Sequence, residues 1–268
     1  MASRLFQRLA DGETAFGANC DINQPEIMEI SGAVGLDFLV IDMMMNSVDW
    51  RTVAAMTLAA DRYGITPGIR LPSYPWAGDR AGVDYHLSGQ ILRSIAVGVQ
   101  DIVVSLETVE QVEAALKPIG ETHQRVYLPS FEYGAHGNRA EREGSGHDAV
   151  RTMLTPLIES ERAIADLDRI LAVPGLESIF LGMGDISIIL GHENDYTHPD
   201  LNAFIGDVAR RAGVHDVAVF ANIHGRSTQD EVVAAVADLE QLGVKGIYVA
   251  RDSAVLVRHY TDLLKRIR

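Results

Sequence analysis

The chain has 268 residues, of which 47% are hydrophobic and 22% charged, and its formal net charge is −14. This composition is typical of a folded globular chain and excludes disorder over most of its length. The acidic balance disfavours nucleic-acid and anionic-membrane partners, which require clustered Lys and Arg, but it leaves small anionic substrates open.

The cysteine content and the absence of signal and membrane segments bear on the cellular compartment. The single cysteine, Cys20, excludes an intrachain disulfide, which fits a reducing compartment. Residues Met1–Gly12 contain no apolar signal core, and no apolar run approaches the roughly 20 residues that a membrane helix needs. We therefore expect a cytoplasmic protein without a membrane partner.

Short apolar and β-branched runs alternate along the chain with longer stretches whose apolar residues recur at helical spacing. The short runs predict buried parallel strands at Ala15–Cys20, Asp37–Met43, Thr66–Leu71, Asp101–Leu106, Met153–Ile158, Ser178–Gly182, Val217–Ile223 and Gly246–Ala250. The stretches between them predict helices at Pro25–Val34, Trp50–Tyr63, Leu87–Val97, Thr108–Ile119, Glu161–Ala172, Pro199–Ala212, Thr228–Leu242 and Ser253–Ile267.

Start and stop signals support these helices. Asp49 or Ser47 is expected to cap the second helix, and Ser227 or Thr228 the seventh. Three similar phrases place a glycine between the end of a helix and the start of a strand, at Gly35, Gly98 and Gly243. The recurrence indicates a repeated βα unit.

Eight βα units in about 250 residues is the size of a TIM barrel. A doubly wound open sheet is the main alternative, but it usually has fewer strands, and no Gly-rich dinucleotide fingerprint follows the first strand. We predict an α/β chain that forms one TIM (β/α)8 barrel domain over residues 1–268. Pro72–His86 and Arg125–His147 do not fit the bare barrel and are expected to be long loops on its catalytic face.

Polar residues at the carboxyl ends of barrel strands point into the mouth, where substrate meets them. The residues in this position are Asp42, Arg70, Glu107, Glu159, Asp185 and His224. Taken singly, each is equally well explained as a helix cap or a solvated rim charge.

Glu159 and Asp185 form the best pair. Two carboxylates from neighbouring strand ends make a hard oxygen site that suits Mg²⁺, Mn²⁺ or Co²⁺, with water positions left for substrate. Gly182 and Gly184, beside Asp185, allow backbone N–H groups to approach an anionic substrate closely.

Two segments carry a resemblance to a known family. They are Leu154–Ser160 and Ile170–Ser187, and the phrases His198-Pro199 and Gly35–Asp42 also fit. In order and over nearly its whole length, the chain resembles the HpcH/HpaI aldolase family, metal-dependent lyases that act on 2-oxo acids.

The resemblance implies a TIM-like barrel in which Glu159 and Asp185 bind the metal. It also implies that Arg70 contacts the oxo acid and steadies its enolate, although a structural salt bridge from Arg70 to Asp42 or Glu107 is the alternative. A homo-oligomer with active sites near subunit contacts, a hexamer or trimer of dimers, is implied as well. A metal that chelates the keto and carboxylate oxygens of pyruvate stabilises the enolate, and Arg70 adds a fixed positive charge.

The sequence departs from the family pattern where the base is expected. The pattern after the second strand is Asp-x-Glu-His, whereas Met44 and Met45 follow Asp42 here. A thioether cannot transfer a proton. The family's partner aspartate falls at Ala96, and the glutamine two positions before the metal glutamate is replaced by Leu157.

Three accounts of the missing base remain open. Another group supplies the acid or base, the candidates being His224, His136 and the run Asp84, Tyr85 and His86. Alternatively, decarboxylation or retro-aldol cleavage generates the enolate without such a base, or the chain only binds metal and oxo acid. The methionines are most simply explained as core packing, and the alternative is that Met44 and Met45 form an apolar substrate wall.

Other enzyme classes lack their signatures. No Walker loop and no nucleophile elbow follows a strand, and no lysine ends the fifth, sixth or seventh strand, as a Schiff-base aldolase requires. We predict a metal-dependent lyase of the aldolase type that cleaves a 2-oxo acid through a metal-bound pyruvate-like enolate, with a small carbonyl compound as partner. The catalytic candidates are Arg70, His224 and Asp42, and Met45 joins Arg70, Gly182 and Gly184 as a substrate contact.

The alternatives to this prediction use the same metal–enolate platform or lack activity. They are a decarboxylating or carbon–carbon bond-forming synthase and a metal-binding pseudo-enzyme.

Overall fold

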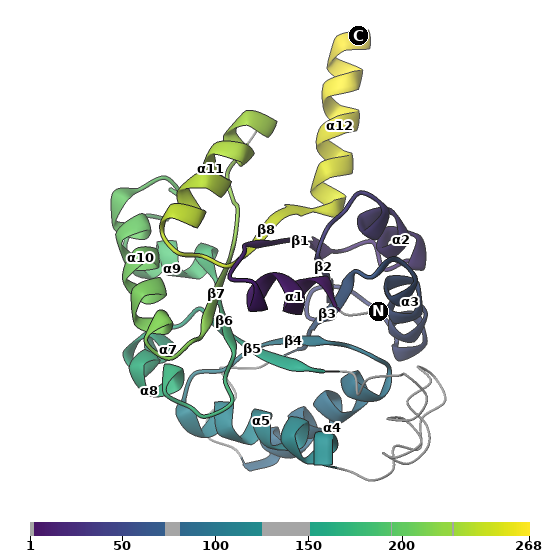
Figure 1. The fold of residues 1–268 in the computed structure, drawn as a ribbon. Coiled ribbons are helices and arrows are strands. Elements are labelled where there is room, and N and C mark those ends of the chain that lie inside the picture. Colours follow the sequence, from purple (N-terminus) through teal and green to yellow (C-terminus); the bar gives the residue numbers. More distant parts are fainter. Residues whose placement is uncertain (1–2, 73–80, 125–150, 194, 227) are drawn as a thin grey trace.

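The computed structural model describes residues 3–72, 81–124, 151–193, 195–226 and 228–268. Eight parallel strands close into a barrel in chain order, as Figure 1 shows. The strands are β1 (Ala15–Cys20), β2 (Phe38–Asp42), β3 (Thr66–Arg70), β4 (Asp101–Ser105), β5 (Met153–Ile158), β6 (Ser178–Leu181), β7 (Ala218–Asn222) and β8 (Gly246–Arg251). The pairing of Ala15 with Gly246 joins the last strand to the first. The TIM-barrel prediction is confirmed.

Helices surround the barrel. They are α1 (Arg4–Ala10), α2 (Pro25–Ala33), α3 (Trp50–Tyr63), α4 (Ala81–Ala96), α5 (Val109–Gln124), α7 (Glu161–Ala165), α8 (Leu167–Leu171), α9 (Met183–Ile189), α10 (Pro199–Gly213), α11 (Gln229–Gln241) and α12 (Asp252–Ile267). In the described part of the chain, none of these helices combines the length and the apolar character that a membrane span requires.

The capping predictions are confirmed at two helices. Asp49 accepts a hydrogen bond from the Thr52 backbone N–H at 2.8 Å. Thr228 and Glu231 form a reciprocal capping box at the start of α11. Gly35, Gly98 and Gly243 have φ angles of 97°, 91° and 92°, a region that side chains disfavour, which explains glycine at these helix ends.

The helix predictions differ from the structure at four places. Helices α1 and α9 have no counterpart among the predicted helices, because each has only 7 residues. Helix α4 begins at Ala81 and takes up part of the loop predicted at Pro72–His86. The single helix predicted over Glu161–Ala172 is two short helices that meet at Asp166.

The amino-terminal end of the barrel is closed by α1. Leu5 is fully buried and packs in the barrel interior with Phe38, Phe220 and Tyr248. The Leu5 backbone N–H donates to Thr66 Oγ1 at the first residue of β3, at 3.1 Å. Because this end is sealed by apolar and aromatic side chains, the opposite end is left for chemistry.

Candidate active site

Arg70 lies at the centre of the polar group at the open end of the barrel. It is the last residue of β3, and its side chain is 19% exposed. One guanidinium nitrogen is 3.6 Å from Asp42 Oδ2 and another is 3.9 Å from Glu159 Oε2. The strand ends therefore hold a cation between two carboxylates. The positions of Asp42, Arg70 and Glu159 at strand ends agree with the sequence prediction, and the Arg70–Asp42 ion pair is the structural alternative that the sequence left open.

Asp42 shapes the loop that follows β2. Its Oδ1 accepts hydrogen bonds from the backbone N–H groups of Met44 and Met45, each at 2.9 Å. Its Oδ2 is buried, has no hydrogen-bond partner among the described residues and faces only Arg70. Asp42 thus fixes both the Met44–Met45 turn and the position of the guanidinium.

Glu159 directly follows β5 and is largely buried, with 16% of its side chain exposed. Ser105, the last residue of β4, donates its hydroxyl to Glu159 Oε1. Burial raises the pKa of Glu159, Ser105 and Arg70 oppose that increase, and the nearby charges of Asp185 and Glu107 add to it. Sequence reasoning missed Ser105, because a serine inside an apolar run gives no functional signal.

Asp185 is close enough to Glu159 to raise its pKa, but it does not end the sixth strand as predicted. It lies in the first turn of α9 and is exposed. Gly182 explains the close approach of this turn, since a Cβ atom there would lie 2.6 Å from the Glu159 Cβ. Gly184 has no such neighbour within 4 Å, so the described contacts do not explain why it is glycine.

The three methionines do not share one environment. Met43 packs against the hydrophobic core, whereas Met45 is 68% exposed. The core interpretation is therefore wrong for Met45, because the turn bound to Asp42 directs the chain outward. Leu157, where the family pattern has glutamine, is buried in the barrel interior.

His224 lies two residues beyond β7 and is half-buried. The Asn222 amide nitrogen contacts its Nε2, and its ring stacks on Tyr196 with centroids 4.9 Å apart. Burial and the charge of Arg251 lower the pKa of His224. A neutral imidazole at this position is able to accept a proton.

Other candidate bases are not brought to this site by the described residues. His136 lies outside them, as do the side chains of Asp84 and Tyr85. His86 is exposed on α4 and contacts Gln90 one turn later. Glu107 faces Arg162 at 3.9 Å rather than Arg70, so the predicted Arg70–Glu107 alternative is replaced by pairing with Asp42.

The side chains of Glu159 and Asp185 have the donor atoms that a divalent metal requires. Glu159 and Asp185 offer hard oxygen ligands at adjoining strand and helix ends. Within the described part of the chain, the buried Asp42 Oδ2 and Arg70 Nε have no hydrogen-bond partners. These features fit a site that is completed by a cation and a small polar ligand.

A second group, His192, His198 and Asp200, also brings possible ligand atoms within 4.8 Å of one another. The two imidazole rings are stacked with centroids 3.4 Å apart and planes at 16°. A cation in the plane of one ring would lie outside the plane of the other, which disfavours shared coordination. His198 Nδ1 also accepts the Asp200 backbone N–H at the start of α10.

Comparison with known proteins places this arrangement in a family. The model of the HpcH/HpaI aldolase/citrate lyase family matches residues 19–251. A hydroxypyruvate/pyruvate aldolase of Pseudomonas aeruginosa is 26% identical over 273 residues, covering 99% of this chain and 93% of its own. A 2-dehydro-3,6-dideoxy-6-sulfogluconate aldolase of Pseudomonas putida is 31% identical over 249 residues, covering 90% and 87%.

The fold comparison agrees. A solved HpcH/HpaI aldolase/citrate lyase family protein from Burkholderia cenocepacia J2315 superposes with a TM-score of 0.73 at 23% identity, covering 100% of both chains. The family match spans every strand from the end of β1 to the end of β8, and therefore all the candidate residues at the barrel mouth. The chain belongs to the HpcH/HpaI aldolase/citrate lyase family and is an enzyme of the carbon–carbon lyase class.

Proposed function

We propose that this enzyme is a divalent-metal-dependent aldolase that breaks or forms the bond between C3 and C4 of a 2-oxo acid, so that C3 becomes the enolate carbon next to the C2 carbonyl. The observation that carries the proposal is the Arg70 guanidinium, held 3.6 Å from Asp42 and 3.9 Å from Glu159 at the barrel mouth. A fixed cation at this point stabilises negative charge that develops on an oxo acid as it becomes an enolate.

Glu159 and Asp185 are the residues that would hold Mg²⁺, Mn²⁺ or Co²⁺. A divalent cation, when bound, supplies a Lewis acid that polarises the substrate carbonyl. The burial that raises the pKa of Glu159 makes its carboxylate costly to leave ionised without a cation beside it. Ser105 orients Glu159 by donating to Oε1, which leaves Oε2 on the Arg70 side.

Asp42 acts through Arg70. Its Oδ1 is occupied by two backbone N–H groups, so the carboxylate cannot rotate freely, and its Oδ2 faces the guanidinium. We therefore assign Asp42 a positioning role and Arg70 the contact with the carboxylate and enolate oxygen of the substrate. The planar guanidinium fork matches either group.

His224 is the described residue best suited to exchange a proton with the substrate. Its lowered pKa keeps it neutral near pH 7, and it lies at the end of a strand on the same edge of the barrel. The Met44–Met45 turn provides no such group. That absence favours, as the second candidate function, a synthase that forms its enolate by decarboxylation and then joins it to a carbonyl compound.

The decisive measurement is turnover with and without divalent metal. Pyruvate with a short aldehyde tests the aldolase, and oxaloacetate tests decarboxylation, each after chelator treatment and after readdition of Mg²⁺, Mn²⁺ or Co²⁺. Metal-dependent condensation supports the aldolase, and oxaloacetate decarboxylation alone supports the synthase. No reaction with either substrate would contradict both candidate functions.

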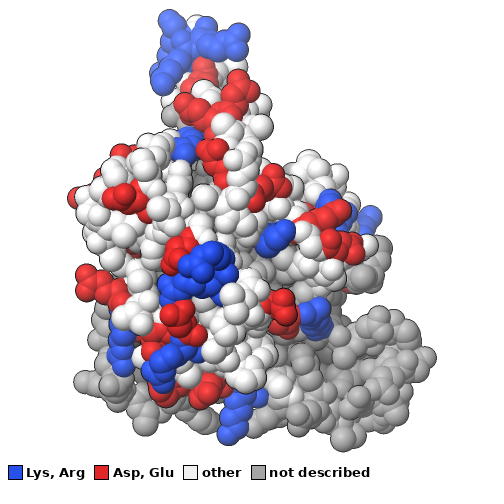
Figure 2. All heavy atoms as spheres, turned by 60° about the vertical axis from the view of Figure 1, so that its left-hand side comes forward, with Lys and Arg blue, Asp and Glu red and all other residues white. Residues whose placement is uncertain are grey.

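A homo-oligomer is part of the proposal, and α12 supports it. This helix has no buried residue and projects away from the barrel in Figure 1. Figure 2 shows basic side chains at its tip, where the last turn carries Lys265 and Arg266. Its exposed apolar side chains recur at helical spacing: Leu256, Tyr260, Leu263, Leu264 and Ile267.

Such a stripe is buried when a second copy of the chain packs on it. Light scattering during size-exclusion chromatography of Leu256→Asp with Leu263→Asp tests this part of the proposal, and the expected result is a smaller assembly.

A further inference from the structure

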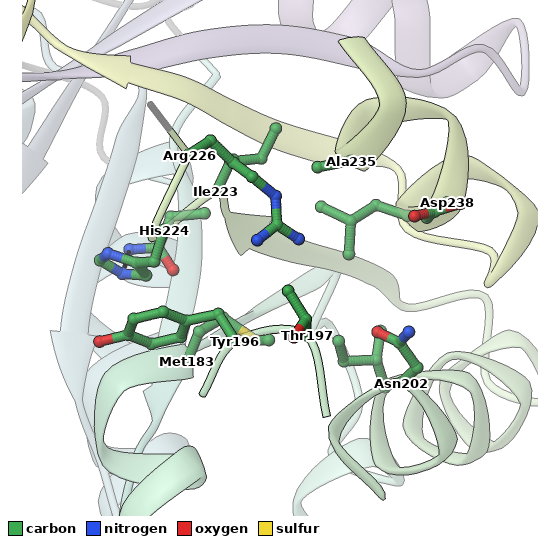
Figure 3. A pocket seen from close by; sticks show the side chains of 12 residues that line it. Met183, Tyr196, Thr197, Asn202, Ile223, His224, Arg226, Ala235 and Asp238 are labelled. Carbon is green, nitrogen blue, oxygen red and sulfur yellow. Dashed lines mark hydrogen bonds between the residues drawn. The ribbon is translucent and has the colours of Figure 1, made fainter. Parts of the chain in front are cut away.

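A small cavity lies between the end of β7, α10 and α11, and His224 forms part of its wall. Its volume is about 90 Å³, and Arg226 and Asn202 also line it. Figure 3 shows the imidazole of His224 against the ring of Tyr196 at one side of this space. The contacts that hold the imidazole decide which of its two nitrogens can exchange a proton.

Tyr196 fixes the plane of the imidazole. The two ring centroids are 4.9 Å apart and the planes are at 26°, which is a stacked arrangement. Gly225, the residue after His224, has a φ of 65°, a region that side chains disfavour. A Cβ atom at Gly225 would lie 3.0 Å from Tyr196 Cδ2, so glycine also makes room for the aromatic ring. The turn after His224 thus allows the two rings to meet.

The segment that carries Tyr196 is held on both sides. Asp195 Oδ1 accepts the backbone N–H of Thr197 at 3.0 Å and its hydroxyl at 2.7 Å, which forms a turn across Tyr196. His198 then caps α10 by accepting the Asp200 backbone N–H at 3.2 Å. The aromatic ring therefore offers a fixed surface to the imidazole.

The other contact of the imidazole is Asn222, the last residue of β7. Its side-chain amide meets the Nε2 atom of His224. Nδ1 has no hydrogen-bond partner among the described residues, so it is the ring nitrogen left for a substrate. In a neutral imidazole one nitrogen carries the proton, and the hydrogen bond at the other ring position decides which one.

Asn222 is able to keep that proton on Nε2. Its side-chain oxygen is buried and has no partner within the described part of the chain. A half turn of the amide exchanges its oxygen and nitrogen, and the oxygen then accepts the Nε2–H of His224. This arrangement gives the buried oxygen a donor and leaves Nδ1 with a free lone pair, as a base requires.

The surroundings of the imidazole favour its neutral form. Burial, followed by the charge of Arg251 at the end of β8, lowers the pKa of His224. Arg251 is itself held by Asp21 at 2.7 Å. Arg226 and Asp238 line the same cavity, and Asp238 is exposed, so water screens its charge. A neutral ring with one nitrogen already occupied is prepared to accept a proton near pH 7.

We propose that Asn222 and Tyr196 are positioning residues for His224: Asn222 keeps the imidazole proton on Nε2, and Tyr196 fixes the ring so that Nδ1 meets the substrate. This inference rests on the proposed function and names the atom that acts in it. The Nδ1 lone pair takes a methyl proton of pyruvate, and the electrons of the broken C–H bond form the C2–C3 double bond of the enolate. The carbonyl electrons move to the C2 oxygen, which gains the negative charge. Both positioning residues act through His224.

Nitrogen NMR of the enzyme labelled with ¹⁵N-histidine detects the position of the proton without any substrate. The signals of His224 are those that disappear in His224→Asn. At about pH 8, where the imidazole is neutral, we expect one tautomer, with the proton on Nε2. Asn222→Leu keeps the size of the side chain and removes the acceptor, so it should give a mixture of both tautomers.

Asn202→Leu is the matched control for this measurement. It makes the same substitution at another half-buried asparagine, on the α10 side of the cavity. We expect the tautomer of His224 to stay as in the natural enzyme. Circular dichroism checks that each variant is folded.

Exchange of the pyruvate methyl protons with deuterium in the presence of Mg²⁺ gives the functional measurement. Asn222→Leu should slow exchange about 5- to 10-fold, because only part of the enzyme then has a free lone pair on Nδ1. Tyr196→Ala should slow it similarly and raise the pH midpoint, because water then reaches the imidazole and relieves the burial that lowers its pKa. Tyr196→Phe keeps the stacked ring and should restore the natural rate and midpoint.

The outcomes separate this inference from the proposed function. A natural enzyme with the His224 proton on Nδ1, or an unchanged tautomer in Asn222→Leu, would overturn the role of Asn222. Natural exchange with an unshifted midpoint in Tyr196→Ala would overturn that of Tyr196. If the tautomer follows Asn222 but pyruvate protons do not exchange, the proton transfer of the proposed function fails and the positioning stands. If exchange is equally fast in the natural enzyme, Asn222→Leu and Tyr196→Ala, the reaction stands and the positioning fails.

Discussion

The two ends of the barrel each contain a buried carboxyl group, but in opposite surroundings. Asp101 begins β4 at the end that α1 seals, and its only described hydrogen-bond partner is the Thr155 hydroxyl. Glu159 follows β5 at the open end, among Arg70, Asp185 and Glu107. Burial raises the pKa of both groups, to about 7 for Asp101.

The difference shows which end is organised for stability and which for chemistry. At the sealed end no charged partner shifts the Asp101 pKa, so the neutral acid is the favoured form below pH 7. At the open end Arg70 lowers the pKa of Glu159, whereas Asp185 and Glu107 raise it. The protonation of Glu159 therefore depends on the charge of any ligand that binds beside it.

The largest effect is expected at Glu159. Glu159→Gln keeps the size of the side chain and removes the buried carboxylate ligand, so Mn²⁺ affinity should fall by about 100-fold or more. Asp185→Asn should cost less, because Asp185 is exposed and water can replace it. Calorimetric titration with Mn²⁺ measures both losses, and circular dichroism checks that the barrel is folded.

Glu177→Gln is the control for this comparison, since Glu177 is paired with Arg151 on the surface. Affinity in the natural enzyme should also decrease as the pH falls through the raised pKa of Glu159, because the protonated acid is a poor ligand. Unchanged Mn²⁺ affinity in both site variants would remove the proposed metal site.

The next largest effect is expected at His224, the candidate base, because Met44 and Met45 cannot transfer a proton. If His224 is the base, His224→Asn should slow exchange of the pyruvate methyl protons with deuterium about 100-fold, as loss of a general base typically does. Because the pKa of His224 is lowered, exchange in the natural enzyme should persist below pH 6.5 and decline at lower pH. Proton NMR of pyruvate in D₂O with Mn²⁺ or Mg²⁺ follows the exchange.

Met44→Glu with Met45→His is the complementary variant, which restores the residue types of the family pattern. Its exchange should exceed that of the natural enzyme, but the gain should be limited because Ala96 replaces the partner aspartate. Met45 is 68% exposed, so the substitution should not disturb the core. If His224→Asn exchanges as fast as the natural enzyme, His224 is not the base.

A smaller loss is expected from Arg70→Lys. Lysine keeps the positive charge between Asp42 and Glu159 but lacks the planar fork, so pyruvate affinity should fall about 10-fold while Mn²⁺ affinity is largely kept. Titration of the Mn²⁺-loaded enzyme with pyruvate measures the change. Equal pyruvate affinity in the two proteins would show that Arg70 is only a structural ion pair.

Most of the barrel and part of the candidate site could be predicted from the sequence. Periodicity located all eight strands, and the strand-end rule located Asp42, Arg70 and Glu159, because parallel strands bring their carboxyl ends to one edge. It could not place Asp185, since a helix of seven residues begins at Met183 without a cap signal.

Contacts between residues far apart in the chain could not be predicted from the sequence, for a different reason. In the closed barrel, Ser105 contacts Glu159 and Asn222 contacts His224. The functional interest of Ser105 and Asn222 comes from these contacts. Arg226 and Asn202 lie 24 residues apart, and both line a cavity that no local pattern marks. Side-chain meetings of this kind depend on tertiary packing, whereas strand ends depend on local spacing.

The smallest effect is expected at the sealed end, from Asp101→Asn. The pKa of Asp101 rises from 3.8 in the unfolded chain to about 7 in the folded one. Between these values the folded chain holds the extra proton, so the free energy of unfolding decreases as pH rises from about 4 to about 7 and stays low above that. Asparagine keeps an oxygen for Thr155 and never ionises. Its Tm should therefore match that of the natural enzyme near pH 4 and exceed it by several degrees at pH 8.

Asp37→Asn is the matched control at the same end of the barrel. Asp37 is also buried, but it accepts the Phe16 backbone N–H at 2.9 Å and lies 3.5 Å from Arg8. Removing its charge should lower Tm at pH 8, because Arg8 keeps only its ion pair with Glu13 and the Phe16 N–H loses a charged acceptor. Thermal unfolding by circular dichroism at pH 4, 6 and 8 measures both variants. If Asp101→Asn also lowers Tm at pH 8, the sealed end holds an ionised and stabilising carboxylate, and the contrast with Glu159 at the open end fails.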